Sequence, residues 1–257
     1  KEYNTNIKTY SVNYKNKETY FINETLKIIQ SDHKYLNGEI DSLVSTADKM
    51  VEIFNEPFGD ISSIFTNLIF DKIKDYHRVV LGGDGADELF SGYIDGIFFH
   101  WKNFFTKINP IKLNEANFSN NKINILYNLI FSSSGELYNS LFFSGWDSNS
   151  RKIFFNNDFN KLIQNQQIES IEKQNFLKNG ENDFERYINS NLEKLSQDFL
   201  VKIDRISMHY SVEARSPFLS KNILNYINKT SKNSHVNFFN RKILLKKICE
   251  QYFSKNF

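Results

Sequence analysis

The chain has 257 residues, of which 40% are hydrophobic and 24% charged, so it can bury a substantial core and is not a disordered tail. Thirty-two Lys and Arg residues against 30 Asp and Glu give a formal net charge of +2, which excludes a large basic field for a nucleic-acid backbone or an anionic membrane. No apolar run approaches the roughly 20 residues of a membrane span, and the single Cys249 cannot form an internal disulfide. We therefore expect a cytoplasmic protein with neither nucleic-acid nor membrane partners.

Residues 1–93 alternate strand and helix patterns. The expected elements are a strand over 9–14, a helix over 25–30, a strand over 33–36, helices over 39–54 and 61–76, and a strand over 78–81. Asp60 is placed to accept hydrogen bonds from the first-turn amides of the helix that follows it. The short apolar run at 78–81 is followed by two glycines, and such a run is typical of a buried parallel strand. The alternation predicts an α/β layer.

Residues 94–257 have a mostly helical pattern. The stretch 94–189 is rich in Phe and Asn, has no clean strand, and resolves into helices joined by polar loops such as Ser132–Gly135. Further helices are expected over 187–210, 220–227 and 240–253. With no repeat or linker in view, we expect one domain over 1–257 with an α/β part at 1–93 and a mostly helical part at 94–257.

The strongest local motif is the glycine-rich turn at 81–93, which reads LGGDGADELFSGY. It follows a strand and opens a helix, where backbone N–H groups can bind a phosphate. Asp84, Asp87 and Glu88 would repel a polyphosphate unless Mg²⁺ lay between them, so the turn predicts a metal-nucleotide site. The alternative is that Asp84 and Asp87 only cap the helix.

Two later segments also carry charge. In the segment 204–220, charged residues alternate with apolar ones, which indicates buried charges in need of partners, and we interpret Glu213 and Arg215 as a structural pair before Pro217. Lys242 opens a basic amphipathic helix, for which a solvated face is the ordinary interpretation. A lysine folded beside the acidic turn could instead neutralise charge on a phosphate oxygen.

Taken together, these segments resemble the synthetase domain of the asparagine synthetase (glutamine-hydrolysing) family. The motifs occur in the family's order, at residues 9–13, 56–64, 78–93, 204–220 and 242–246. Five ordered matches span most of the chain, and only 94–189 is unmatched. The resemblance implies a pyrophosphatase-type, adenine nucleotide alpha-hydrolase-like parallel sheet with a mostly helical C-terminal half.

The resemblance also implies an activity. An aspartate-like carboxylate attacks the α-phosphorus of ATP in the presence of Mg²⁺, pyrophosphate leaves, and ammonia then displaces AMP from the acyl-adenylate. The implied partner is a glutaminase domain or subunit that supplies the ammonia, and a homodimer is compatible with the same family.

The resemblance assigns roles to individual residues. The positions that match the family's nucleotide-binding residues are Val12, Gly82, Gly83 and Gly85. Asp84 matches the acidic position tied to formation of the aspartyl-adenylate. Asp87 matches the carboxylate that binds Mg²⁺ and pyrophosphate, and Lys242 matches the lysine that stabilises the pentavalent phosphorus and the leaving group.

The sequence also departs from the family. The S-G-G-x-D-S loop that binds pyrophosphate is expected upstream of Lys1, so we expect this chain alone to be inactive. The segment 144–148, SGWDS, is one residue short of that loop and lies in another part of the chain. The glutaminase nucleophile is missing as well, and Cys249 cannot replace it. Gly82 and Lys246 stand where the family usually has Ser and Arg, and Ser220 where it has Asp.

Two other interpretations fit the same motifs. One is a related amide-forming synthetase with another acceptor, as in β-lactam synthetases, lasso-peptide cyclases or enzymes that amidate surface polysaccharides. The other is a degenerate family member kept as a binding module, which the changes at 82 and 246 favour. The presence of Asp84, Asp87 and Lys242 favours an enzyme.

Overall fold

The computed structural model describes residues 7–12, 17–37, 40–108, 121–142, 151, 153–166, 168–231 and 234–253. The chain forms two compact units, which are described separately. Unit 1 comprises Lys1–Asp84, Leu195–Lys221 and Lys246–Phe257. Unit 2 comprises Gly85–Lys194 and Asn222–Leu245.

Unit 1 combines parallel strands with helices. Its elements are β1 (Lys8–Val12), α1 (Lys17–Ile29), β2 (Asp32–Leu36), α2 (Ile40–Phe54), α3 (Ser62–Ile73), β3 (Val79–Leu81), a π-helix (Leu195–Phe199), α12 (Leu200–His209), β4 (Glu213–Arg215) and a 3-10 turn (Pro217–Leu219). Strand β1 pairs in parallel with β2, and β3 pairs in parallel with β4. The α/β prediction is confirmed, and the three predicted strands overlap β1, β2 and β3, although residues 13–14 of the first lie outside the described residues. Helix α1 is longer than the predicted 25–30 and begins at Lys17.

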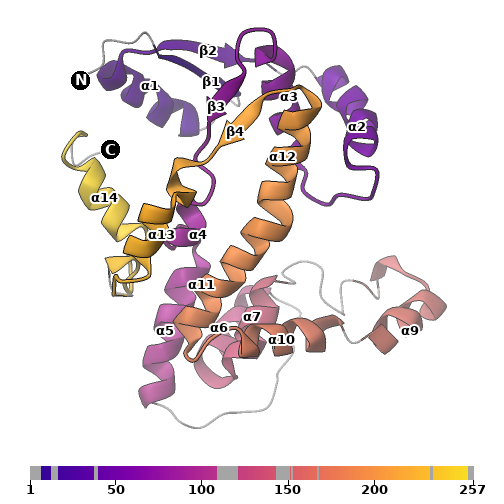
Figure 1. The fold of residues 1–257 in the computed structure, drawn as a ribbon. Helices are drawn as coiled ribbons and strands as arrows, with labels where there is room; N and C mark the ends of the chain where they lie inside the picture. The colour runs from indigo at the N-terminus through magenta and orange to yellow at the C-terminus, as the bar shows by residue number, and fades with distance from the viewer. Residues whose placement is uncertain are drawn as a thin grey trace. The chain divides into compact units, whose positions relative to one another are not determined.

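The core of unit 1 lies between helices and one sheet face. Its buried members are Met50, Phe54, Phe70, Ile73, Ile206, Tyr210 and Val212. Helix α12 packs along α3 (Figure 1), and Val80 and Ala214 turn toward this cluster from β3 and β4. The apolar residues of α2, α3 and α12 therefore pack into one core.

The prediction that the strand at 78–81 is buried is wrong. Val79 and Leu81 are 45% and 72% exposed, and only Val80 packs on the core. Successive side chains of a strand point to opposite faces, and the core cluster covers only one face of this short sheet. The outward residues therefore stay accessible.

The pairing of Glu213 with Arg215 is confirmed, but the burial expected for it is wrong. The Arg215 Nε donates to Glu213 Oε1 at 2.8 Å, and the two side chains are 62% and 55% exposed. Both residues lie on the outward face of β4, on either side of the inward Ala214. An exposed pair of this kind contributes little stability.

Asp60 caps α3, as the sequence predicted, and also ties it to α12. Its Oδ1 accepts the Ser62 N–H at 2.8 Å, and its Oδ2 accepts from the buried Lys202 Nζ at 2.6 Å. Burial alone would raise the pKa of Asp60, but the hydrogen bonds from Lys202 and Ser62 hold it below its usual value. Nearby, Arg205 pairs with Glu56 at 3.0 Å. The motif at 56–64 is therefore bonded to α12 at Lys202, and its Glu56 contacts the motif at 204–220 through Arg205.

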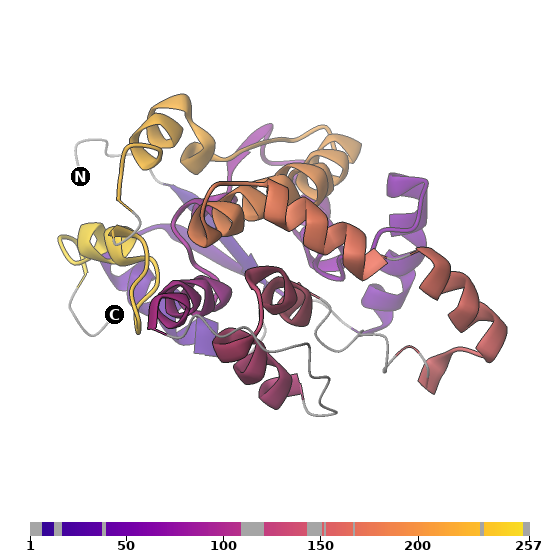
Figure 2. The ribbon, with the colours of Figure 1, turned by 90° about the horizontal axis from the view of Figure 1, so that it is seen from below.

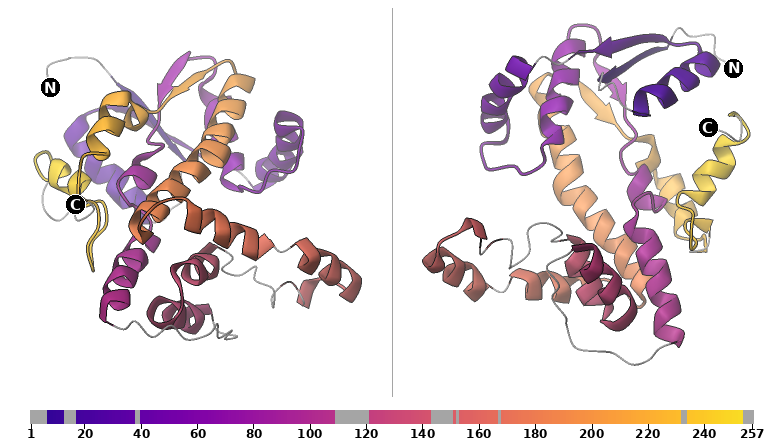
Figure 3. Two further views of the ribbon diagram at one scale, coloured as in Figure 1. Left: turned by 60° about the horizontal axis from the view of Figure 1, so that its bottom comes forward. Right: turned by 180° about the vertical axis from the view of Figure 1, so that it is seen from behind.

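Unit 2 contains helices and loops, with no strand among its described residues. Its helices are α4 (Ala86–Leu89), α5 (Asp95–Ile108), α6 (Asn121–Phe131), α7 (Ser134–Phe142), α9 (Asn157–Gln166), α10 (Ile168–Lys178) and α11 (Asp183–Lys194), and the last two helices of the chain are α13 (Lys221–Ile227) and α14 (Ile243–Cys249). Helix α6 packs against α7 (Figure 2), and α5 against α11 (Figure 3). Their shared core is Phe99, Leu129, Leu137, Tyr138, Phe176, Phe184, Tyr187 and Val236. Across the described part of the chain, no helix is both long and apolar enough to cross a membrane.

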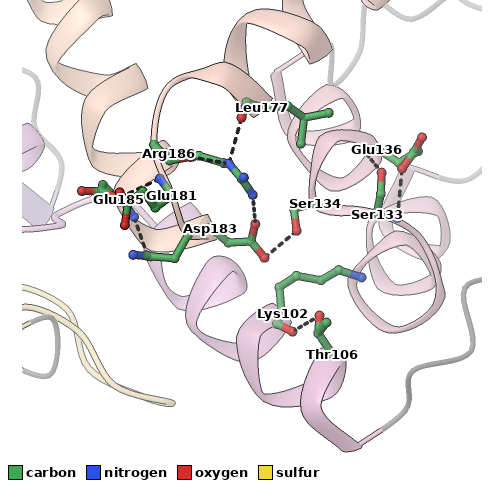
Figure 4. Close-up of polar contacts among 12 residues, drawn as sticks. Lys102, Thr106, Ser133, Ser134, Glu136, Leu177, Glu181, Asp183, Glu185 and Arg186 are labelled. Carbon is green, nitrogen blue, oxygen red and sulfur yellow. Dashed lines mark hydrogen bonds and ion pairs between the residues drawn. The ribbon is translucent and has the colours of Figure 1, made fainter.

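Helix α7 begins with a capping box, which the sequence analysis treated as an ordinary loop. The Ser133 N–H donates to Glu136 Oε2 at 2.9 Å, and the Glu136 N–H donates back to Ser133 Oγ at 3.3 Å. Figure 4 shows Ser134 and Arg186 turned toward Asp183, whose two oxygens accept their hydrogen bonds. These contacts fix the start of α7 against the start of α11.

Replacement of Ile206 by alanine tests the core of unit 1. Ile206 is fully buried, so Ile206→Ala should lower the free energy of unfolding by about 2–5 kcal/mol, measured by urea denaturation. Met208 lies on the same helix with 55% of its surface exposed, and Met208→Ala should change stability by less than about 0.5 kcal/mol. Equal effects of the two changes would contradict this description of the core.

Candidate functional site

The first half of the acidic turn belongs to unit 1. The Gly82 N–H donates to Arg215 O at 2.9 Å, which extends the pairing of β3 with β4 by one residue. A Cβ on Gly82 would lie 2.7 Å from Asp84 Oδ2, so the missing side chain leaves room for this carboxylate. A Cβ on Gly83 would meet nothing within 4 Å. Val12 ends β1, opposite Leu36 of β2. Strand β1 therefore ends at a candidate nucleotide-binding residue, Val12, and β3 is followed directly by two others, Gly82 and Gly83.

The second half of the turn begins unit 2 with Gly85. Its φ of 87° is in the left-handed region, where a residue without Cβ is unstrained, and it caps α4. The Leu89 N–H donates to Gly85 O at 3.0 Å, which closes the first turn of the helix. Asp87 and Glu88 lie in that turn, where the helix dipole favours negative charge.

Asp87 and Lys242 form an ion pair within unit 2. The Lys242 Nζ lies 2.7 Å from Asp87 Oδ1, and the side chains are 34% and 41% exposed. The two side chains meet directly against Gly92. A Cβ on Gly92 would lie 1.6 Å from Asp87 Oδ1 and 2.4 Å from Lys242 Cε. Lys242 is thus folded beside the acidic turn, which is the condition under which a phosphate role becomes chemically reasonable.

Glu88 has a different environment from Asp87. It is buried, and its Oε1 accepts the hydrogen bond of the Tyr93 hydroxyl. Burial, with the hydrogen bond to Glu88 and its charge, raises the pKa of Tyr93 far above the usual value, so the phenol stays protonated. Asp87 is therefore the accessible carboxylate of this helix turn, while Glu88 holds Tyr93.

The carboxylates of the acidic turn suit a Mg²⁺ ion that is bound jointly by the protein and by the phosphates of a substrate. Among the described residues, no group of three or more His, Cys, Asp or Glu side chains could hold a metal by itself. Mg²⁺ is usually held by one or two carboxylates together with substrate phosphates and water, so a cluster of three is not required. The accessible Asp87 fits such a site as its carboxylate ligand.

The loop before Lys242 contains residues that the sequence analysis did not identify. Arg241 Nη1 donates to Gly92 O at 2.7 Å, next to the ion pair. Lys242 has a φ of 52° and Ser91 a φ of 54°, both in the left-handed region. The predicted helix over 240–253 is shorter than expected, since Lys242 leaves the helical conformation and α14 begins at Ile243. The segment 144–148 lies outside the described residues.

Comparison with known proteins decides the family. A family model described as asparagine synthase matches residues 1–257, the whole chain. The chain belongs to the asparagine synthase family. A similar curated protein is the "Putative asparagine synthetase [glutamine-hydrolyzing] 2" of Methanocaldococcus jannaschii, 31% identical over 90 residues. The match covers 34% of this chain and 18% of that protein. The resemblance seen in the motifs is thereby confirmed at the level of the family.

Replacement of Gly92 tests the close approach that the ion pair needs. Gly92→Ala would push a methyl group into Asp87 and Lys242, so the free energy of unfolding should fall by about 1–3 kcal/mol as the pair is displaced. Gly59→Ala is the control, because a Cβ there meets nothing within 4 Å. Thermal unfolding of both variants measures the difference, and a Gly92→Ala variant as stable as the control would refute the crowding.

Proposed function

We propose that this chain is the synthetase part of an ATP-dependent, amide-forming ligase of the asparagine synthetase type. Its substrate is an aspartate-like carboxylate, and the ammonia comes from glutamine through a glutaminase domain or subunit. The observation that carries the proposal is the ion pair of Lys242 with Asp87 at the start of α4, together with the family membership of the whole chain.

The proposed chemistry has two steps. A carboxylate oxygen of the substrate attacks the α-phosphorus of ATP, and the bond from that phosphorus to the bridging oxygen of pyrophosphate breaks. Ammonia then attacks the acyl carbon, loses a proton to form the amide, and AMP leaves with the electrons of the acyl–oxygen bond. Lys242 supplies a positive N–H donor to the oxygens that gain charge in the first step.

Other residues contribute binding. Asp87 would hold Mg²⁺, which when bound neutralises phosphate charge. Gly82, Gly83 and Gly85 would bind the nucleotide through backbone groups, and Val12 would contact adenine. Asp84 would act in formation of the adenylate. The position of the glycines after the carboxyl end of β3 supports this assignment, since ligands of parallel sheets bind at that edge.

The wider context belongs to the same proposal. We expect a pyrophosphatase-type sheet and a cytoplasmic setting, and a homodimer is compatible with the proposal. A synthetase with another acceptor is the second candidate, which the divergent helical segment 94–189 favours. A panel of acids and amines in the assay below separates the two.

Substitution of Asp87 and Lys242 tests the proposed reaction. In the full-length protein, Asp87→Asn and Lys242→Ala should each lower aspartate-dependent ATP–pyrophosphate exchange by about 100-fold or more, because charge stabilisation at the phosphates is lost. Lys247→Ala is the matched control, since Lys247 is an exposed lysine in α14. Exchange that survives both changes would instead identify a different catalytic site. A wild-type protein without exchange for any acid in the panel would favour the degenerate binding module.

A further inference from the structure

The loop that carries Lys242 adopts a strained conformation and is closed by its own hydrogen bonds. The Ile243 N–H donates to His235 O at 3.1 Å, and within that closure the Asn237 N–H donates to Asn240 O at 3.0 Å. A lysine at a φ of 52° is strained, because its Cβ approaches the following carbonyl oxygen. Such a conformation persists only where the surroundings determine it. The position of the lysine therefore depends on what holds this loop.

One contact comes from Phe238, next to the tip of the loop. Its ring stands edge-on to three rings of α5, with centroids 4.7 Å from His100, 5.5 Å from Trp101 and 5.3 Å from Phe104. The indole Nε1–H of Trp101 donates to the carbonyl oxygen of Phe238 at 2.8 Å. Edge-to-face rings and a directional hydrogen bond fix both the side chain and the backbone of Phe238.

Helix α5 is itself immobilised at this point. Lys102, the neighbour of Trp101, is 3% exposed, and its Nζ donates to three carbonyl oxygens at the end of α6. Figure 4 shows the side chain of this lysine extended away from the ribbon of α5. Phe99 is 1% exposed in the core of the same unit. Trp101 therefore projects from a fixed segment of α5.

The other side of the loop contacts the acidic turn. Arg241 donates to Gly92 O, and Lys242 pairs with Asp87. The loop is thus held between the aromatic residues of α5 and the turn at α4, with Phe238 at one side and Lys242 at the other.

We propose that Trp101 and Phe238 are positioning residues for Lys242, so that the helical segment without family motifs serves the same site as the acidic turn. The inference rests on the proposed function of Lys242 and goes beyond it. It assigns a role to α5, to which the sequence motifs gave none.

The test measures how well Lys242 is held, independently of activity. The full-length protein is treated with acetic anhydride, and mass spectrometry compares the acylation rate of Lys242 with that of the exposed Lys246. Phe238→Ala and Trp101→Phe should each raise the relative rate by about threefold or more, because loss of the anchor weakens the pair with Asp87. Tyr226→Ala is the control, since that ring is 57% exposed on α13 of the same unit, and it should leave the rate unchanged.

Trp101→Phe keeps an aromatic ring and removes only the N–H donor and the larger indole. If circular dichroism shows that Phe238→Ala does not fold, the Trp101→Phe variant alone tests the proposal. An unchanged Lys242 rate in a folded Trp101→Phe variant overturns the proposal. Where exchange activity is present, Trp101→Phe should lower kcat about tenfold while KM for ATP stays within about twofold, as expected for misplacement of a residue used in the transition state. A wild-type protein without ATP–pyrophosphate exchange refutes the proposed function. The acylation rates still show whether Trp101 and Phe238 position Lys242.

Discussion

The ion pair of Lys242 with Asp87 imposes the main constraint on the candidate site. Two side chains from segments 155 positions apart in the numbering meet over a position that has room only for glycine. Their approach explains why Gly92 lacks a side chain. The pair is partly exposed, so it contributes little to stability in itself. Its placement agrees with the proposed role of Lys242 at the phosphates and does not depend on a large contribution to stability.

In unit 1, by contrast, charged residues of two motifs support the fold. Asp60 and Lys202 are bonded in a largely buried position, and Glu56 and Arg205 pair beside them. Removing one partner of the buried pair would leave an uncompensated charge, which is far more costly than losing an exposed pair. The bond of Asp60 with Lys202 thus holds the start of α3 against α12, and the strands β3 and β4 pack on these helices. The acidic turn follows β3 directly, so this packing fixes the place where the turn begins.

Much of this architecture was predictable from periodicity and capping residues. The strands β1 to β3 and the cap at Asp60 were predicted from local patterns, whereas the stretch 94–189 was predicted only to be helical, without bounds for its helices. Strand β4 was missed because its three residues, Glu213 to Arg215, carry charges outward and only a small Ala214 inward. The burial of β3 was overpredicted because hydrophobicity alone does not say whether both faces are covered. The left-handed conformation of Lys242 has no signature in its residue type, since lysine rarely adopts it.

The conformation of Lys242 has a consequence for protein engineering. Glycine or asparagine tolerates a positive φ better than lysine, so either replacement would relieve strain of about 1 kcal/mol. A library selected only for heat resistance would therefore tend to enrich changes at this position. If the lysine serves the reaction, the enriched clones would be robust and catalytically dead, so such a selection would need a parallel screen for turnover.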